Sequence, residues 1–135
     1  MDTQTTVSYG YEAMLRGETM AAAREKVAAA LKAEGFGVLT EIDVKETLKK
    51  KIDVDFRPYV ILGACNPNLA HKALTADPQI GLLLPCNVVL QQAEGGIKVS
   101  ALKPAIMFQV VDDPALKPVA EDADARIRRA MASLK

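Results

Sequence analysis

Two short segments of this sequence carry the residues most able to do chemistry, because they hold its only two cysteines. The first segment reads GACNP (63–67) and the second reads LPCN (84–87), so each cysteine directly precedes an asparagine. A thiolate can attack an electrophile or bind a metal ion, and an amide can donate hydrogen bonds to negative charge. Because each segment adjoins an apolar run, both thiols should lie where the interior meets a turn. The candidate ligand-binding residues are Cys65, Asn66, Cys86 and Asn87, and the two cysteines are also the catalytic candidates.

A purely structural role for the same residues stays open. Free cysteine is among the most buried residue types and often packs as a small hydrophobe. Asn66 followed by Pro67 is typical of a helix start, with asparagine as the N-cap and proline at the first helical position. Asn87 could hydrogen-bond a bulge that Pro85 introduces into its strand. Structural packing and a thiol or ligand site are therefore both compatible with these two segments.

A metal site is the third alternative. Two cysteines and the sole histidine, His71, are one ligand short of a tetrahedral zinc site, and Asp43 is a candidate for the fourth ligand. The cysteines are 21 positions apart, which matches no zinc ribbon. We expect His71 to face solvent, because other residues of its helix form the inward face: Ala70, Ala73 and Leu74. The sequence therefore predicts no metal site, and it identifies no cofactor.

The composition limits the kinds of partner. A chain of 135 residues fits one domain with one core, so we expect a single domain over 1–135. There are three Tyr, three Phe and no Trp, which predicts an aliphatic core and argues against aromatic platforms for single-stranded nucleic acid. Lys plus Arg equals Asp plus Glu at 17 each, so the electrostatic footprint of a DNA- or RNA-binding protein is missing from the sequence. We expect no nucleic-acid partner.

The sequence also predicts where the protein resides. Its first residues, 1–6, have neither the basic start nor the apolar stretch of a signal peptide. No apolar run in the sequence reaches the roughly 18–20 residues that span a bilayer. Two cysteines in a chain of this length do not indicate a disulfide framework. We expect a cytoplasmic, soluble protein with reduced thiols and no membrane partner.

The two motifs must be positioned by the surrounding elements, and in the first half of the chain three local signals indicate where helices begin or end. Thr19 is placed to cap a helix, and Gly35 stands where a helix end favours positive φ. Asp43 with Glu46 three residues later has the spacing of a capping box. The elements expected in this half are a strand over 5–11, a helix over 20–34, a strand over 36–42 and a helix over 44–51.

The second half contains both motifs. A nearly continuous apolar run predicts a buried strand over 59–64, followed by a helix from Asn66 to about Thr75. A long strand is expected over 81–91, where Pro85 implies an edge or a bulge, because proline has no N–H for the ladder. A turn over 93–96 leads into a strand over 97–102. A short helix from Pro104 and a long one from Pro118 follow, the latter with an apolar stripe at Val119, Ala123, Ile127, Met131 and Leu134.

The two motifs and their surroundings resemble the pattern of domain of unknown function 302, a mainly bacterial and archaeal family. The similar segments are GACNP (63–67), IGLLLPCNVV (80–89) and GFGVLTEIDV (35–44), the last of which resembles the family's second strand. The resemblance covers nearly the whole chain. It implies an α+β fold of the TATA-binding-protein-like type, with a largely antiparallel sheet of about five strands packed against helices, and a homodimer. It implies no activity, because none is established for the family.

The topology decides what the cysteines can do. In a parallel crossover Cys65 and Cys86 would lie far apart, whereas in an antiparallel sheet the end of one strand lies beside the start of the next. The resemblance favours the antiparallel arrangement, so we expect the thiols to approach each other near the helix that begins at Asn66. That helix N-terminus would lower a thiol pKa.

Two functions from different classes follow from these residues. The first is a small-molecule or anion-binding module with a cleft lined by Cys65, Asn66, Cys86 and Asn87. The alternative is a thiol-dependent enzyme or redox sensor with Cys65 as the reactive thiolate and Cys86 as its resolving partner. The sequence has neither a Cys-x-x-Cys motif nor an evident general base beside the thiols, so we favour binding. We expect a homodimer built on sheet edges or on the last helix, because zero net charge gives little repulsion between copies.

Overall fold

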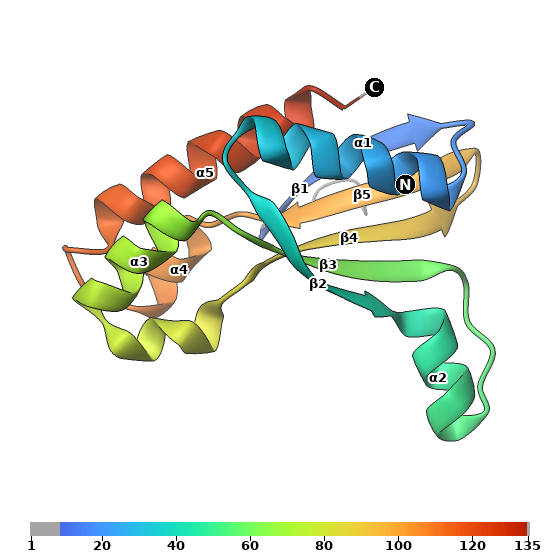
Figure 1. The fold of residues 1–135 in the computed structure, drawn as a ribbon, viewed down its shortest axis with the longest axis horizontal. Helices are drawn as coiled ribbons and strands as arrows, with labels where there is room; N and C mark the ends of the chain where they lie inside the picture. The colour runs from blue at the N-terminus through green and yellow to red at the C-terminus, as the bar shows by residue number, and fades with distance from the viewer. Residues whose placement is uncertain (1–8, 135) are drawn as a thin grey trace.

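The computed structural model describes residues 9–134, and across these residues five strands form one antiparallel sheet in the order β1-β5-β4-β3-β2 (Figure 1). The strands are β1 (Gly10–Arg16), β2 (Gly37–Asp43), β3 (Tyr59–Cys65), β4 (Cys86–Ala93) and β5 (Gly96–Leu102). The helices are α1 (Met20–Ala33), α2 (Val44–Ile52), α3 (Pro67–Ala76), the 3-10 helix η2 (Pro78–Leu83), α4 (Ile106–Val110) and α5 (Lys117–Ala132). The predicted α+β fold with a largely antiparallel sheet is confirmed, and its TATA-binding-protein-like type stays a prediction.

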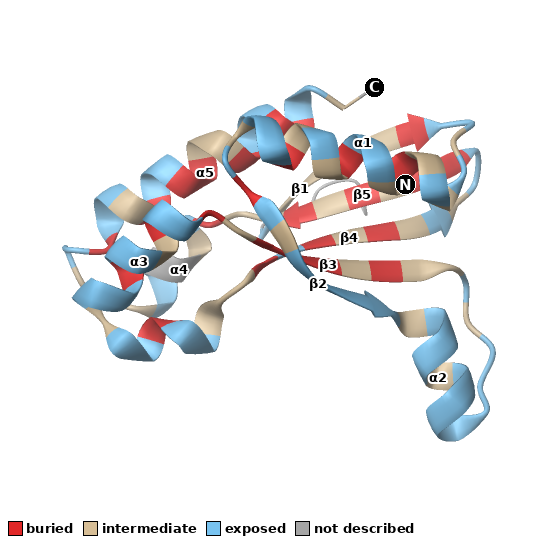
Figure 2. Ribbon diagram, viewed as in Figure 1, coloured by how far each residue is buried: buried red, intermediate tan, exposed pale blue. Residues whose placement is uncertain are grey.

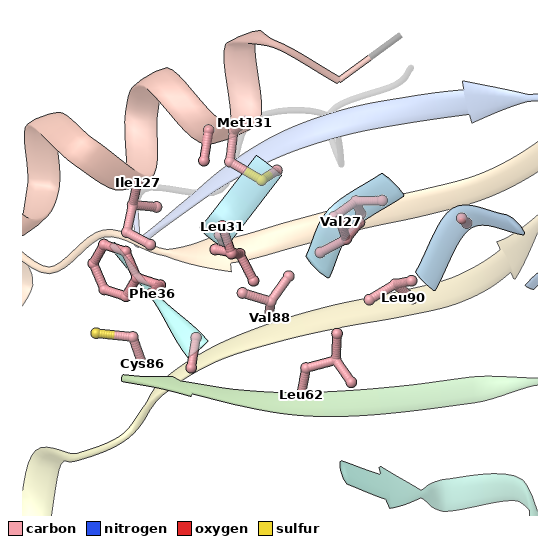
Figure 3. Packing of buried hydrophobic residues seen from close by; sticks show 14 of the residues in the cluster. Val27, Leu31, Phe36, Leu62, Cys86, Val88, Leu90, Ile127 and Met131 are labelled. Atoms are coloured by element: carbon pink, nitrogen blue, oxygen red, sulfur yellow. The ribbon is translucent and has the colours of Figure 1, made fainter. Parts of the chain in front are cut away.

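Two long helices, α1 and α5, cover one face of the sheet and bury the main core against it (Figure 1). Figure 2 shows that the buried positions of both helices face the strands. Val27 and Leu31 of α1 and Ile127 of α5 pack with Leu62 and Val88 of the sheet (Figure 3). These side chains are aliphatic, as the composition predicts. The apolar stripe expected on the last helix is therefore used inside the chain.

The opposite face of the sheet is left open by α1 and α5, and we call it the uncovered face. The residues of this face follow from the alternation along each strand, because successive side chains point to opposite faces. In β3, for example, Val60, Leu62 and Ala64 are buried in the core, whereas Tyr59 and Ile61 are half-buried. The uncovered face consists of Glu12, Met14, Arg16, Thr40, Ile42, Tyr59, Ile61, Asn87, Val89, Gln91, Lys98, Ser100 and Leu102.

The local helix signals are confirmed. Thr19 accepts a hydrogen bond from the Ala22 N–H at 3.1 Å, and Asp43 accepts one from the Glu46 N–H at 2.9 Å. Gly35 adopts a φ of 86° after α1, which is the left-handed conformation that glycine adopts most easily. Each signal involves residues at most four positions apart, so it acts before tertiary packing does. The three predicted helix boundaries are correct for that reason.

Two predicted strands differ from the structure. The first strand is β1 at Gly10–Arg16 rather than 5–11, and residues 5–8 of the prediction lie outside the described residues. The strand expected over 81–91 begins only at Cys86, because residues 78–83 form η2. Asp77 starts η2 by accepting a hydrogen bond from the Gln79 N–H at 3.0 Å. Ile80 is buried there with Leu116, so the apolar run belongs to a helical turn.

No helix within residues 9–134 is both long and apolar enough to cross a bilayer.

Candidate functional site

The two Cys-Asn motifs lie side by side in the sheet. β3 and β4 are antiparallel neighbours, with Ala64 opposite Cys86 and Gly63 opposite Asn87. Cys65 therefore follows the residue that faces Cys86, and the expected approach of the two cysteines is confirmed. Both thiols are free.

A close contact at Gly63 joins the two motifs. A Cβ atom added at Gly63 would lie 2.2 Å from the Thr40 Oγ1 and 2.8 Å from the Pro85 Cγ. Both distances are well below ordinary van der Waals contact. The first motif therefore requires glycine at this position because the proline of the second motif lies directly against it.

The alternation of the sheet separates the two neighbours in the second motif. Cys86 points to the covered face, where its sulfur lies near Phe36 (Figure 3), and only 8% of its surface is exposed. Asn87, the next residue, is exposed and belongs to the uncovered face. Of the four residues expected to line one cleft, Cys65, Asn66 and Cys86 share one hollow, Asn66 also lines a second, and Asn87 lines a third.

The first hollow lies beside the thiols and has a volume of about 30 Å³. That is close to the share of one water molecule in the liquid. Its lining includes Cys65, Cys86, Phe36, Leu69 and Val119, and it is almost entirely apolar. A small-molecule substrate does not fit in this space.

The electrostatics of Cys86 oppose thiolate chemistry. Burial, and secondarily negative charge on the neighbouring Cys65, raise the pKa of its thiol from 9.0 to about 11. Cys86 is therefore a protonated thiol at neutral pH.

The second hollow, of about 430 Å³, lies at the start of α3. Asn66 is buried there; its side-chain oxygen accepts a hydrogen bond from the Leu69 N–H at 3.2 Å, and its side-chain nitrogen donates to the Glu34 carbonyl at 3.5 Å. Its polar atoms are thus engaged in capping the helix and holding the end of α1. Lys72 and Arg126 also line this hollow.

The orientation of α3 agrees only in part with the prediction. His71 is exposed, as expected. Ala73 is buried as expected, but Leu74 is 40% exposed and Leu69 takes the second inward position. The expectation for Leu74 is wrong because Leu69 and Ala73, four residues apart, form the buried face of this short helix.

The third hollow has a volume of about 450 Å³ and lies on the uncovered face around Asn87. Tyr59, Gln91, Lys98 and Ser100 line it together with Asn87. The Lys98 Nζ lies 3.3 Å from a Glu12 carboxylate oxygen, and both side chains are largely shielded from solvent. With Tyr9, the hollow therefore combines two tyrosine rings, two amides, a serine hydroxyl and a neutralised charge pair.

Most residues of this third hollow were not predicted from the sequence, although the sequence contains a usable signal. Asn87, Val89 and Gln91 alternate with Cys86, Val88 and Leu90, which is the period of a strand with one face buried. That alternation assigns Asn87 and Gln91 to one face and Cys86 to the other. Lys98 and Ser100 follow only from the pairing of β4 with β5, which is not a local property.

Among residues 9–134, no cluster of three or more His, Cys, Asp or Glu side chains is arranged to hold a metal ion.

Comparison with known proteins agrees with the fold. The family model for Domain of unknown function DUF302 matches residues 12–134. The crystal structure of an uncharacterized conserved DUF302 protein from Bacillus stearothermophilus is similar to this chain, with a TM-score of 0.85 and 34% sequence identity. That similarity covers 96% of this chain and 100% of the other. No curated protein matches the sequence.

Proposed function

The chain belongs to the family Domain of unknown function DUF302, and we propose that it is a small-molecule-binding module whose ligand occupies the hollow around Asn87. The observation that carries the proposal is the volume of this hollow, about 450 Å³, together with its mixed lining. Pockets for small molecules typically measure about 300–1,000 Å³ and combine apolar walls with a few polar groups. Of the three hollows around the two motifs, this one fits that description best.

The lining favours a ligand with a planar apolar body and a polar edge. The Tyr59 ring and the Val89 side chain offer the apolar surface. The Asn87 and Gln91 amides and the Ser100 hydroxyl can each donate and accept hydrogen bonds. Such groups can orient a ligand by hydrogen bonds without reacting with it, which agrees with a binding role.

Within this proposal the four motif residues have different parts. Asn87 contacts the ligand. Cys86 acts from the covered side, where it is buried in the core at the start of β4, Cys65 ends β3, and Asn66 caps the start of α3. The alternative, a thiol-dependent enzyme or redox sensor using Cys65 and Cys86, has less support. The raised pKa of Cys86 and the space of about 30 Å³ beside the thiols both disfavour it.

The test uses benzoate and benzamide as probes, because both present a planar ring and a polar edge but only benzoate is charged. Each is titrated into ¹⁵N-labelled protein, and the side-chain amide signals of Asn87 and Gln91 are followed by NMR. We expect both signals to shift with saturation. The Asn87→Ala variant should weaken binding about tenfold, as expected for loss of one hydrogen bond.

The matched control is Asn68→Ala, which removes the same amide from an exposed position lining the hollow at the start of α3. It should leave the affinity for both probes unchanged. If neither probe shifts the Asn87 signal, or if Asn68→Ala alone abolishes binding, the proposal is rejected. A shift produced only by benzoate would indicate that Lys98 contributes to ligand choice.

We propose a cytoplasmic location, since free thiols are typical of a reducing compartment. We also propose a single domain over 1–135 that acts as a homodimer without a nucleic-acid partner. The last helix is a poor candidate for the dimer contact, because Ala123, Ile127 and Met131 are already buried within the chain.

A further inference from the structure

The register of the sheet aligns apolar side chains in a row across the uncovered face. Ile42 lies opposite Ile61, and Ile61 lies opposite Val89. The row continues through Ser100 to Glu12 at the far edge. Ile42 is 48% exposed, so the apolar half of this row reaches the β2 edge open to solvent.

The Glu12 and Lys98 charges, on the β1 and β5 side of the face, cancel, and the central strand β4 carries no charged residue on this face. Glu12 and Lys98 lie on neighbouring strands and form an ion pair of 3.3 Å, with 14% and 26% of their side chains exposed. Asn87, Gln91 and Ser100 are the neutral polar residues beside them. A second surface can therefore approach this face without meeting an uncompensated charge at its centre.

Helix α2 adds a second observation. None of its nine residues, all of them within the described chain, is buried. Ile52 at its end is 63% exposed, and Val54 just beyond it is 43% exposed. A helix this short is marginal on its own, because helices in proteins are stabilised chiefly by packing of an apolar face. In Figure 1, α2 projects beyond the β2 edge of the sheet, away from α1 and α5.

We infer that the uncovered face packs against the same face of a second copy of this chain, with α2 of each copy extending the contact. This inference rests on the proposed function in one respect: the hollow around Asn87 becomes a closed cavity between the copies. By two-fold symmetry, Tyr59 and Asn87 of both copies then line the ligand site.

The area of the face is sufficient for a stable dimer. Five strands spaced by about 4.8 Å, each of seven or eight residues rising about 3.3 Å, make a face of roughly 550 Å². Two such faces bury roughly 1,100 Å² before α2 is counted, above the roughly 1,000 Å² that marks a specific interface. Depletion of charge at the centre is also typical of interface cores.

The chemistry favours a second copy over a membrane or a charged partner. An anionic bilayer attracts clustered, uncompensated lysines and arginines, whereas Lys98 on β5 is paired with Glu12. A strongly charged protein partner would require a complementary field, which the ion pair removes. A neutral face of mixed isoleucine, valine, tyrosine and amides is complementary to itself under a two-fold rotation.

The experiment compares two lysine substitutions by light scattering and sedimentation at micromolar concentration. Wild-type protein should have a mass of about 29 kDa, twice the 14.5 kDa of one chain. Ile61→Lys should weaken the dimer by roughly 100-fold or more, because the two-fold brings like charges together in the contact. The matched control is Leu82→Lys, which makes the same change at a leucine that is 83% exposed on η2.

Circular dichroism melting accompanies each measurement, and Ile42→Lys replaces Ile61→Lys if the latter fails to fold, since Ile42 is already 48% exposed. A monomeric wild type overturns the inference, as does an Ile61→Lys or Ile42→Lys protein that stays as dimeric as Leu82→Lys. Benzoate binding by a chain that proves monomeric would overturn this inference alone. Conversely, a dimer that is lost in Ile61→Lys but binds neither benzoate nor benzamide would reject the proposed function alone.

Discussion

Replacement of Gly63 by alanine tests whether the two Cys-Asn motifs are packed together as the register requires. Gly63 lies on β3 opposite Asn87, and the space above its Cα is filled by Thr40 and Pro85. The substitution adds a single methyl group and changes no charge or hydrogen bond. Any loss of stability therefore reports the closeness of these neighbours.

The magnitude follows from the two distances. The added Cβ would lie 2.2 Å from the Thr40 Oγ1, but this contact is partly relieved because Thr40 is exposed and its side chain can rotate. The 2.8 Å distance to the Pro85 Cγ is harder to relieve, because the proline ring is tied to the backbone. Overpacking of this kind costs about 1–3 kcal/mol. We expect a decrease of about 2 kcal/mol in the free energy of unfolding for Gly63→Ala.

The assay is urea denaturation followed by circular dichroism, in which about 2 kcal/mol moves the midpoint by roughly 1 M. Gly37→Ala is the matched control, because a Cβ at Gly37 meets no atom within 4 Å on the neighbouring strand. The control should be neutral or stabilising by up to about 1 kcal/mol, since alanine restricts the unfolded chain. The double variant Gly63→Ala with Thr40→Ala should recover part of the loss but not all of it.

The result that would refute the reasoning is a Gly63→Ala protein as stable as Gly37→Ala. That outcome would mean that Pro85 does not lie over Gly63 and that the two motifs are not in contact. A full recovery in the double variant would be informative in a different way. It would assign the whole strain to Thr40 and none to the second motif.

Two further predictions concern buried groups. Because the pKa of Cys86 is raised from 9.0 to about 11, its contribution to stability is fully present below pH 9.0 and is lost as the pH rises toward 11. Over that range the free energy of unfolding of the wild type should fall by roughly 2–3 kcal/mol more than that of Cys86→Ala. The same pH dependence of the free energy of unfolding in both proteins, measured by urea denaturation, would contradict this. Asp124 accepts hydrogen bonds from the Tyr11 hydroxyl and from the Ala105 N–H, the latter at 3.0 Å, so Asp124→Ala should destabilise the fold by about 2–3 kcal/mol. Asp122→Ala, two residues earlier, removes a carboxylate from an exposed ion pair with Arg126 and should cost less than about 1 kcal/mol by thermal denaturation. Equal losses for the two variants would be inconsistent with a buried role for Asp124.

The features that could be predicted from the sequence are those determined within one turn or one strand. Thr19, Asp43 and Asn66 each accept a hydrogen bond from an N–H three residues later, so their identity alone indicates a helix start. The stripe on α5 repeats every four residues, which predicts its buried face before any partner is known. The approach of Cys65 to Cys86 could not be predicted from local signals, because it depends on the direction of β4 relative to β3. The family resemblance indicated that these strands are antiparallel.

The remaining features depend on which elements meet. The apolar run before Pro85 has the composition of a strand, but Ile80 is buried against Leu116, more than thirty positions later in the chain, and the run forms η2. The hollow around Asn87 likewise combines β3, β4 and β5, so its lysine and serine could not be assigned to it from β4 alone. Long-range pairing, rather than propensity, determines both.

Cys86 and Asn87 are neighbours in the chain but point to opposite faces of the sheet, so the packing of one affects the position of the other. Cys86 is held among core side chains, and a slip of β4 by one residue would place its thiol on the uncovered face and drive Asn87 into the core. An unpartnered amide there costs several kcal/mol, so the buried cysteine fixes the register that presents Asn87 to a ligand. The contact between Pro85 and Gly63 opposes the same slip at the start of β4. The cysteines can therefore matter for binding without any reaction at sulfur, and substitutions that keep Cys86 small and apolar should retain the site.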